Sequence, residues 1–249
     1  MLSGNRSFDS YLAGGAAILI EPNTTRYSRD LDYFHDSDRR VAEAFASDRD
    51  LLERSGYALD VDLLQPGYAR AIVRKDGQAT KVEWARESSW RFMPTVKDDR
   101  VGFLLHPVDL AVNKVLALAG RDEPRDVLDV LQLHRRVLPL GALCWAACGK
   151  DPGFTPLSLL ELLKRRGRIR PDELARLDLA EPVDLVVLKE EWLEALDSVE
   201  PFVSSRPPDE FGCLYYSCSK RAFVDPRGVA DALPHFGRPG GVLPRVESS

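Results

Sequence analysis

Two aspartates near the N-terminus have a spacing that suits metal chemistry. Asp30 and Asp32 alternate with Leu31, Tyr33 and Phe34, which favour β-strands, whereas aspartate does not. Side chains two residues apart on a strand point to the same face, so the two carboxylates project together and repel each other. A divalent cation would relieve this repulsion, and paired carboxylates can hold the metals used in phosphoryl transfer. A solvated strand face is the alternative interpretation.

A glycine pair lies upstream of the aspartates. Residues 11–19 predict a short strand, a turn at Gly14 and Gly15, and the start of a helix that runs from Ala16 to Glu21. Backbone N–H groups at such a turn can bind an anion. The glycine pair is therefore a candidate phosphate site, and a simple turn is the alternative.

A third carboxylate is expected on a β-hairpin. Asp76-Gly77 predicts the turn between a strand at 68–74 and a strand at 79–85. Lys81 and Glu83 lie two residues apart, so they share one face of the second strand. Glu83 is the candidate that would complete a metal site, and an exposed strand glutamate is the alternative.

A second group of charged residues falls in helical sequence. Lys114 lies in a helix that begins at Pro107 and ends at Gly120, and its small and apolar neighbours predict partial burial. A buried cation needs an anionic partner, and a triphosphate would serve. Arg121 lies on the adjoining helical face. Asp126 falls in the first turn of the next helix, where the helix dipole favours an aspartate in any case.

The order and spacing of these motifs match a known pattern. Gly14-Gly15 followed by Asp30-x-Asp32 is the pattern of the nucleotidyltransferase superfamily. The longer string resembles the AbiEii/AbiGii family of toxin nucleotidyltransferases, which includes the mycobacterial Men toxins, in Gly14-Gly15, Arg26-x-Ser28-x-Asp30-Leu31-Asp32, Lys81-x-Glu83, Lys114 and Arg121-(x)3-Arg125-Asp126-(x)2-Asp129. The resemblance covers roughly residues 8–135. Ala16 departs from it, because many relatives have Ser or Thr there.

The resemblance implies an enzyme that uses Mg²⁺ or Mn²⁺. It would transfer a nucleoside monophosphate (NMP) from a nucleoside triphosphate (NTP) to an acceptor hydroxyl and release pyrophosphate. Lys114 would bind phosphate, and Asp126 would contact the nucleotide or assist deprotonation of the hydroxyl. The metal ligands implied are Asp30, Asp32 and Glu83, which with Lys114 and Asp126 form the catalytic set. The nucleotide-binding residues implied are Gly14, Gly15, Arg26, Ser28, Lys81, Lys114 and Arg121. The implied acceptor is the 3′ end of a tRNA, and the implied context is the toxin of a toxin–antitoxin pair, with a possible antitoxin partner.

The composition agrees with a globular enzyme. The chain has 249 residues, of which 44% are hydrophobic and 29% are charged, and a formal charge of −5. A negative charge argues against a protein that coats nucleic acid broadly, but it leaves room for one basic patch. Residues 164–170 form the densest basic run, which is either an RNA-docking patch or a solvated helix end. The N-terminus lacks the apolar core of a signal peptide, no apolar run reaches membrane-spanning length, and we expect a cytoplasmic protein.

The predicted fold is α+β, with a nucleotidyltransferase fold (a mixed sheet flanked by helices) followed by a mainly helical domain. The expected boundaries are 1–100 for the catalytic domain, 101–203 for a helical domain that completes the active site, and 204–249 for a C-terminal hairpin with a loose tail after Pro234.

Two other classes of function remain open. A non-catalytic protein that senses nucleotides or binds a partner could keep the same fold, although the intact trio Asp30, Asp32 and Glu83 argues against it. A nucleotidyltransferase that acts on a protein or a small molecule is the second alternative.

Overall fold

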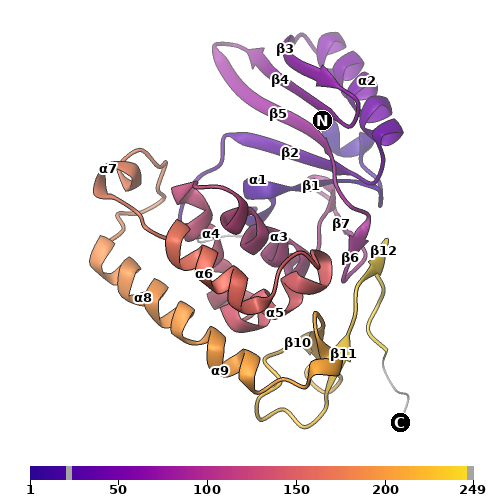
Figure 1. Cartoon of the computed structure of the whole chain (residues 1–249). Coiled ribbons are helices and arrows are strands. Elements are labelled where there is room, and N and C mark those ends of the chain that lie inside the picture. Colours follow the sequence, from indigo (N-terminus) through magenta and orange to yellow (C-terminus); the bar gives the residue numbers. More distant parts are fainter. Residues whose placement is uncertain (21–23, 246–249) are drawn as a thin grey trace. The chain divides into compact units, whose positions relative to one another are not determined.

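The computed structural model describes residues 1–20 and 24–245, which divide into two compact units (Figure 1). The first unit contains residues 1–20, 27–106 and 238–241 of the described chain, and the second contains residues 24–26, 107–237 and 242–245. The first unit is built on a sheet and the second is mainly helical, which confirms the α+β prediction.

A mixed seven-stranded sheet organises the first unit, in the order β3-β4-β5-β2-β1-β8-β7. The strand β2 pairs with β5 in parallel and with β1 in antiparallel orientation, and β1 pairs in parallel with β8. The strands β3, β4 and β5 form an antiparallel meander. The strand bounds are Ser10–Ala13 for β1, Asp30–His35 for β2, Ala58–Gln65 for β3, Tyr68–Lys75 for β4, Gln78–Arg86 for β5, Val96–Asp98 for β7 and Gly102–Leu104 for β8.

The helix α2 (Asp38–Arg54) covers one face of this sheet (Figure 1). Its N-terminus is capped by the Ser37 side chain, which accepts a hydrogen bond from the Arg40 backbone N–H. Alternation along the strands sends Val82 and Trp84 to the α2 side, where Trp84 meets Phe45 edge-on with ring centroids 5.2 Å apart. The opposite face of β2 and β5 therefore receives the alternate residues, among them Asp30, Asp32, Lys81 and Glu83.

Two short segments precede and follow β1. The 3-10 helix η1 (Leu2–Asn5) lies at the N-terminus, and α1 (Gly14–Ile18) follows β1 directly. The predicted strand, glycine turn and helix start are confirmed, and α1 begins two residues earlier than expected. The helix ends at Ile18, so the prediction that it runs on toward Glu21 is wrong; Glu21 itself lies outside the described residues.

The C-terminal segment contains more strands than expected. The predicted hairpin forms from β9 (Leu214–Ser217) and β10 (Ala222–Phe223), and β11 (Ala232–His235) completes a three-stranded sheet in the order β10-β9-β11. The prediction of a loose tail after Pro234 is wrong, because β12 (Arg238–Pro239) pairs with β6 (Trp90–Arg91) in the first unit. That pairing joins residues about 150 positions apart, which local sequence patterns do not reveal.

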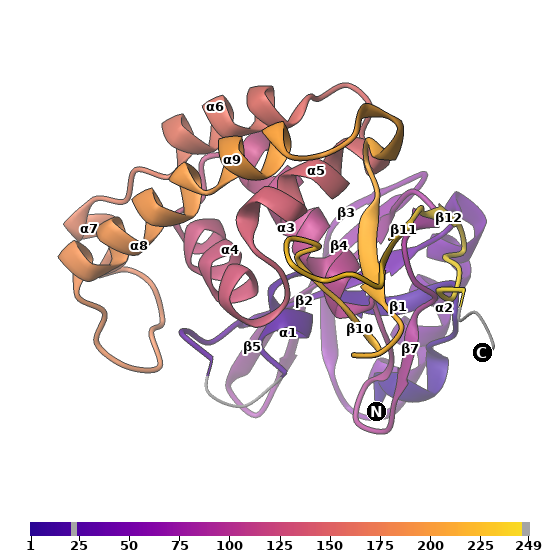
Figure 2. The ribbon, with the colours of Figure 1, turned by 90° about the horizontal axis from the view of Figure 1, so that it is seen from below.

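Helices make up most of the second unit. The helix α5 is buried along nearly its whole length and contacts α3, α6 and α9, so it forms the centre of this unit (Figure 2). The bounds are Pro107–Gly120 for α3, Pro124–Arg136 for α4, Leu140–Lys150 for α5, Pro156–Arg166 for α6, Pro171–Leu174 for α7, Leu185–Asp197 for α8, Val199–Ser204 for α9 and Pro208–Glu210 for the 3-10 helix η2. Within residues 1–20 and 24–245, none of the helices combines the length and the apolar character needed to span a membrane.

Candidate functional site

The parallel pairing of β2 with β5 places the predicted carboxylates side by side. Asp30 lies opposite Lys81 and Asp32 lies opposite Glu83 in the strand register. Residues two apart on each strand share a face, so all four side chains project from the polar face of the sheet. Each of the four is only partly buried. We call the three carboxylates, Asp30, Asp32 and Glu83, the carboxylate row, and Lys81 lies beside it.

Lys81 bridges two members of the carboxylate row. Its Nζ lies 3.1 Å from Asp30 Oδ2 and 3.3 Å from Glu83 Oε1. Burial alone would lower the pKa of Lys81, but the hydrogen bond to Asp30 and the charges of both carboxylates outweigh it, so the pKa is raised. The ammonium therefore stays charged at neutral pH and balances the carboxylates around it.

Tyr68 is a further neighbour of the row that the sequence motifs did not indicate. Burial and a hydrogen bond with Glu83 both raise the pKa of the Tyr68 phenol. Arg70 lies opposite Glu83 in the register, yet its guanidinium forms an ion pair with Asp62, with Nη2 2.6 Å from Oδ2. Alternation along the predicted hairpin would have placed Tyr68 and Arg70 on the face of Lys81, so this signal was present in the sequence.

The glycine turn lies directly against the second aspartate. Gly14 has φ of +60°, and a Cβ at this position would lie 1.9 Å from Asp32 Oδ2. Only glycine avoids that overlap and tolerates this backbone conformation without strain. Ser28 lies two residues before the row, and its hydroxyl donates a hydrogen bond to the Asp30 carbonyl over 3.3 Å. The structure thus brings the glycine pair and the aspartate strand together at Gly14 and Asp32.

The donor atoms of the row fit a hard divalent cation. Carboxylate oxygens are the protein ligands that suit Mg²⁺ and Mn²⁺, and Asp30, Asp32 and Glu83 present them from one face. Within the described part of the chain, no three His, Cys, Asp or Glu side chains converge as they would around a bound metal. The Lys81 ammonium lies between two of the three candidate ligands.

A second charged cluster lies within the helical unit. Lys114 on α3 is 7% exposed, and its Nζ lies 3.1 Å from Asp126 Oδ1 and 3.0 Å from Asp129 Oδ2 on α4. Both aspartates are fully buried. The sequence predicted that a buried Lys114 requires an anionic partner, and the chain itself supplies two. Contact between Lys114 and a triphosphate stays a prediction.

Two arginines complete this cluster. Arg121 donates to Asp126, with Nε 2.7 Å from Oδ2. Arg26 donates two parallel hydrogen bonds to Asp129, from Nε to Oδ1 over 2.9 Å and from Nη2 to Oδ2 over 2.7 Å. Burial opposes ionisation of Asp126, but the hydrogen bonds and charges of Arg121 and Lys114 outweigh it and lower its pKa. Asp126 is therefore a carboxylate that holds cations, and its low basicity makes it a weak proton acceptor.

The segment before β2 is also fixed within the helical unit. The Gln132 side chain on α4 accepts hydrogen bonds from the Thr25 backbone N–H and hydroxyl, each 3.2 Å long. Arg26, which the motif indicates as a nucleotide-binding residue, is buried and occupied with Asp129. The sequence motifs did not indicate Gln132. Asp129 belonged to the family resemblance, but no role was predicted for it. Spacing of three residues along α4 could have indicated all of Asp126, Asp129 and Gln132.

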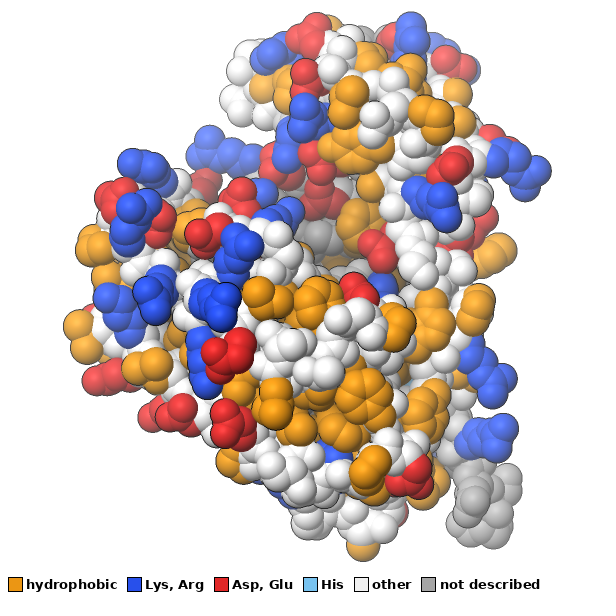
Figure 3. Space-filling view, viewed as in Figure 1, with side chains coloured by type: hydrophobic (Ala, Val, Ile, Leu, Met, Phe, Trp, Pro, Cys, Tyr) orange, Lys and Arg blue, Asp and Glu red, His pale blue; other side chains and the backbone are white. Residues whose placement is uncertain are grey.

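The basic run is only partly neutralised. Lys164 forms an ion pair with Glu161 and Arg170 with Glu173, at 3.1 Å and 2.7 Å. Arg165, Arg166 and Arg168 have no ion pair among the residues that the structure describes. Cationic and anionic side chains are mixed over the surface formed by α6, α7 and α8 (Figure 3). The three arginines are thus the part of the run that is available to a phosphate backbone.

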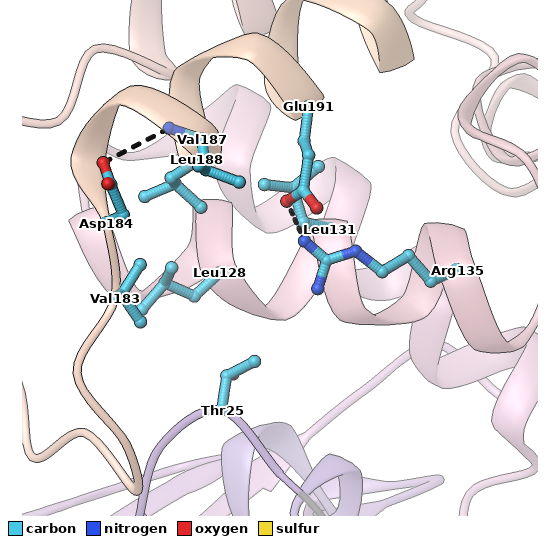
Figure 4. A pocket seen from close by; sticks show the side chains of 9 residues that line it. All are labelled: Thr25, Leu128, Leu131, Arg135, Val183, Asp184, Val187, Leu188 and Glu191. Carbon is cyan, nitrogen blue, oxygen red and sulfur yellow. Dashed lines mark hydrogen bonds and ion pairs between the residues drawn. The ribbon is translucent and has the colours of Figure 1, made fainter.

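An apolar cavity of about 230 Å³ lies between α4 and α8, with Thr25 at its edge (Figure 4). An ion pair between Arg135 and Glu191 closes one side. None of the residues predicted to bind nucleotide or metal lines it; the lining residues are Thr25, Leu128, Leu131, Arg135, Val183, Asp184, Val187, Leu188 and Glu191. An apolar lining of this kind does not suit a triphosphate.

Comparison with known proteins identifies the fold that carries these two clusters of charged residues. No protein-family model matches the chain. No curated protein matches its sequence. Among solved structures, the nucleotidyltransferase toxin MenT4 from Mycobacterium tuberculosis H37Rv matches with a TM-score of 0.55 and 16% identity, over 84% of this chain and 80% of MenT4. JHP933 from Helicobacter pylori matches with a TM-score of 0.45 and 16% identity, over 82% of this chain and 90% of its own. The match to MenT4 confirms the resemblance drawn from the motifs at the level of the fold: the chain has the nucleotidyltransferase fold.

Proposed function

We propose that the chain is a metal-dependent nucleotidyltransferase, which transfers NMP from an NTP to an acceptor hydroxyl. The observation that carries this proposal is the carboxylate row across β2 and β5, beside the Gly14 turn, on a sheet of nucleotidyltransferase fold. In the reaction, the hydroxyl oxygen attacks the α-phosphorus, the bond to the bridging oxygen of the β-phosphate breaks, and pyrophosphate leaves. The proton of the attacking hydroxyl passes to solvent water.

Residues of the first unit would bind and orient the phosphates and the metal. Asp30, Asp32 and Glu83 would hold the divalent cation, which supplies positive charge to the phosphoryl oxygens when bound. The backbone N–H groups at Gly14 and Gly15 would donate hydrogen bonds to phosphate oxygens. They would have to suffice, because no side-chain hydroxyl is present at Ala16. Lys81 and Ser28, which adjoin the row, would make further phosphate contacts.

Residues of the second unit would supply positive charge to the nucleotide and a carboxylate that orients those cations. Lys114 and Arg121 would contact the NTP, and Asp126 would orient both cations, since it already accepts hydrogen bonds from each. The low pKa of Asp126 favours this orienting role over removal of the hydroxyl proton. Arg26 would act through Asp129, because it donates a hydrogen bond to each oxygen of that carboxylate.

The acceptor in this proposal is the 3′ end of a tRNA, and the biological role is that of a toxin controlled by an antitoxin. The motif resemblance supports this assignment, and so does the fold of MenT4, which is described as a nucleotidyltransferase toxin. Arg165, Arg166 and Arg168, cations without an ion pair in the described chain, offer contacts for an RNA backbone.

A labelling experiment tests the proposal. Purified protein is incubated with total RNA, Mg²⁺ and each NTP in turn, labelled at the α-phosphate. We expect label at the 3′ end of tRNA with at least one NTP. Asp30→Asn should remove nearly all of this labelling, because it deletes one candidate metal ligand without disturbing the core.

The same assay can contradict the proposal in two ways. If label appears in no RNA, protein or small-molecule fraction with any NTP, the chain is not a nucleotidyltransferase under these conditions and the proposed function fails. If Asp30→Asn transfers label as fast as the unaltered protein, the carboxylate row is not the catalytic centre. A matched variant, Asp60→Asn, removes an exposed strand aspartate that is paired with Arg74 and should leave the rate unchanged.

A further inference from the structure

Lys81 lies where a cation would have to enter the carboxylate row. Its Nζ is 3.1 Å from Asp30 Oδ2 and 3.3 Å from Glu83 Oε1, and these are two of the three oxygen donors assigned to the metal above. A single side chain therefore already neutralises part of the negative charge that would attract a divalent ion. Glu83 has Tyr68 as a second partner, so both of its contacts lie on this sheet face.

The strand register makes this arrangement intrinsic to the fold. Lys81 lies opposite Asp30 on the neighbouring parallel strand and two residues from Glu83 on its own strand. The Cα atoms of all three are fixed by the ladder between β2 and β5, so the ammonium cannot avoid this neighbourhood except by swinging its side chain away. Arg70, which lies opposite Glu83 on the same face, forms an ion pair with Asp62.

We propose that Lys81 is an internal counter-cation that competes with the divalent metal for Asp30 and Glu83. This inference rests on the proposed function and extends it to the control of metal loading. The metal and the ammonium attract the same two carboxylates and repel each other, so the row can bind a divalent ion only when the Lys81 side chain turns away. A triphosphate beside the row would give the displaced ammonium a new anionic partner, so nucleotide and metal would load together.

The competition predicts that removal of the positive charge tightens metal binding. Lys81→Met keeps an unbranched apolar stem and deletes the charge. We expect the dissociation constant for Mn²⁺, measured without nucleotide by electron paramagnetic resonance of the free ion, to fall by at least about tenfold in this variant, because a unit charge is removed within a few ångströms of the bound ion. Lys81→Arg retains the charge and should bind Mn²⁺ as weakly as the unaltered protein.

Two controls separate this effect from other changes. Lys97→Met makes the same substitution at an exposed position on β7 of the same sheet, and it should leave the Mn²⁺ affinity within about twofold. Lys81→Met combined with Asp30→Asn should lose the gain, because one of the two competing carboxylates is neutral. Thermal unfolding of each variant, followed by circular dichroism, establishes that the compared proteins are folded.

The inference is overturned if Lys81→Met binds Mn²⁺ no more tightly than the unaltered protein, or if neither protein has a saturable Mn²⁺ site. It is also overturned if Lys97→Met gives the same gain, because the effect would then be one of net charge. These outcomes are independent of the labelling assay. A protein that transfers no NMP but gains Mn²⁺ affinity in Lys81→Met would refute the proposed function and leave the competition intact.

Discussion

Gly14 and Asp32 depend on each other at the scale of single atoms. The space that a side chain at residue 14 would need is filled by the Asp32 carboxylate, with the added Cβ 1.9 Å from Oδ2. The positive φ of Gly14 is a second constraint at the same position. A substitution here would therefore displace a candidate metal ligand as well as strain the backbone.

Gly14→Ala should reduce NMP transfer on the order of 100-fold, because displacement of a reactive group by about 1 Å can have an effect of that size. Gly77→Ala is a matched control, since Gly77 also has a positive φ, of +76°, but its Cβ would meet no atom within 4 Å. Both variants should lose about 1 kcal/mol of stability from the backbone conformation. Steady-state labelling rates and thermal unfolding measure the two effects, and equal rates for the two variants would contradict the coupling of Gly14 to Asp32.

Because Lys114 is buried against two aspartates, its replacement would affect stability as well as any contact with the nucleotide. The two aspartates that it contacts are fully buried, so each would lose part of its compensating charge if Lys114 were replaced. Loss of activity in such a variant would combine a weakened fold with any weakened phosphate contact. Separate measurements of unfolding and of NTP affinity are the way to assign its role.

At the scale of elements, the end of α6 concentrates cations where the helix dipole favours them. Lys164, Arg165 and Arg166 form its last turn, and Arg168 follows the C-cap Gly167. Partners in the chain neutralise Lys164 and, beyond the helix, Arg170. A solvated helix end and an RNA-docking patch both explain these residues, and salt dependence distinguishes the two.

Replacement of Arg165, Arg166 and Arg168 by Ser should raise the KM for RNA and flatten its dependence on salt. If each arginine contacts one phosphate, the slope of log affinity against log salt should fall by about 2 to 3. The matched control replaces Arg39, Arg49 and Arg54 on α2 by Ser, which removes the same charge from another helix. Equal salt slopes for the two triple variants would show that RNA does not dock on the end of α6.

At the scale of the whole molecule, buried ionisable groups make the stability depend on pH. His35 at the end of β2 is fully buried, and neither of its ring nitrogens has a hydrogen-bond partner among the residues described. Burial, followed by the charges of Arg6 and Arg40, lowers the pKa of His35 to about 3. The unfolded chain, in which a histidine has a pKa of about 6.5, therefore binds this proton more readily than the folded chain.

The folded state should lose stability as the pH falls below about 6.5, on the order of 2 to 3 kcal/mol by about pH 4.5. Equilibrium unfolding in urea at several pH values measures this loss. His35→Leu removes the titrating group, so its stability should vary less with pH across the same window. The buried aspartates contribute little to this loss, because carboxylates in the unfolded chain titrate mostly below this pH window. An unchanged pH slope in His35→Leu would contradict the assignment.

Local sequence determined the parts of the candidate site that depend on nearest neighbours along the chain. Alternation with a period of two placed Asp30 with Asp32 and Lys81 with Glu83, because successive side chains on a strand point to opposite faces. Turn residues fixed the hairpin at Asp76-Gly77, and the glycine pair fixed the junction of β1 and α1. Each of these features follows from backbone geometry within a few residues, so one sequence was sufficient to predict it.

Tertiary structure decided which of these local features meet. The parallel ladder between β2 and β5 set Asp32 opposite Glu83, and it placed the Lys81 ammonium between Asp30 and Glu83. The contact of Arg26 with Asp129 joins residues 103 positions apart, and it gives a predicted nucleotide-binding residue a buried carboxylate as partner. Such contacts form because strand pairing and burial compete over the whole chain. A local pattern of residues therefore does not show which distant segment will pair with a strand or contact a buried charge.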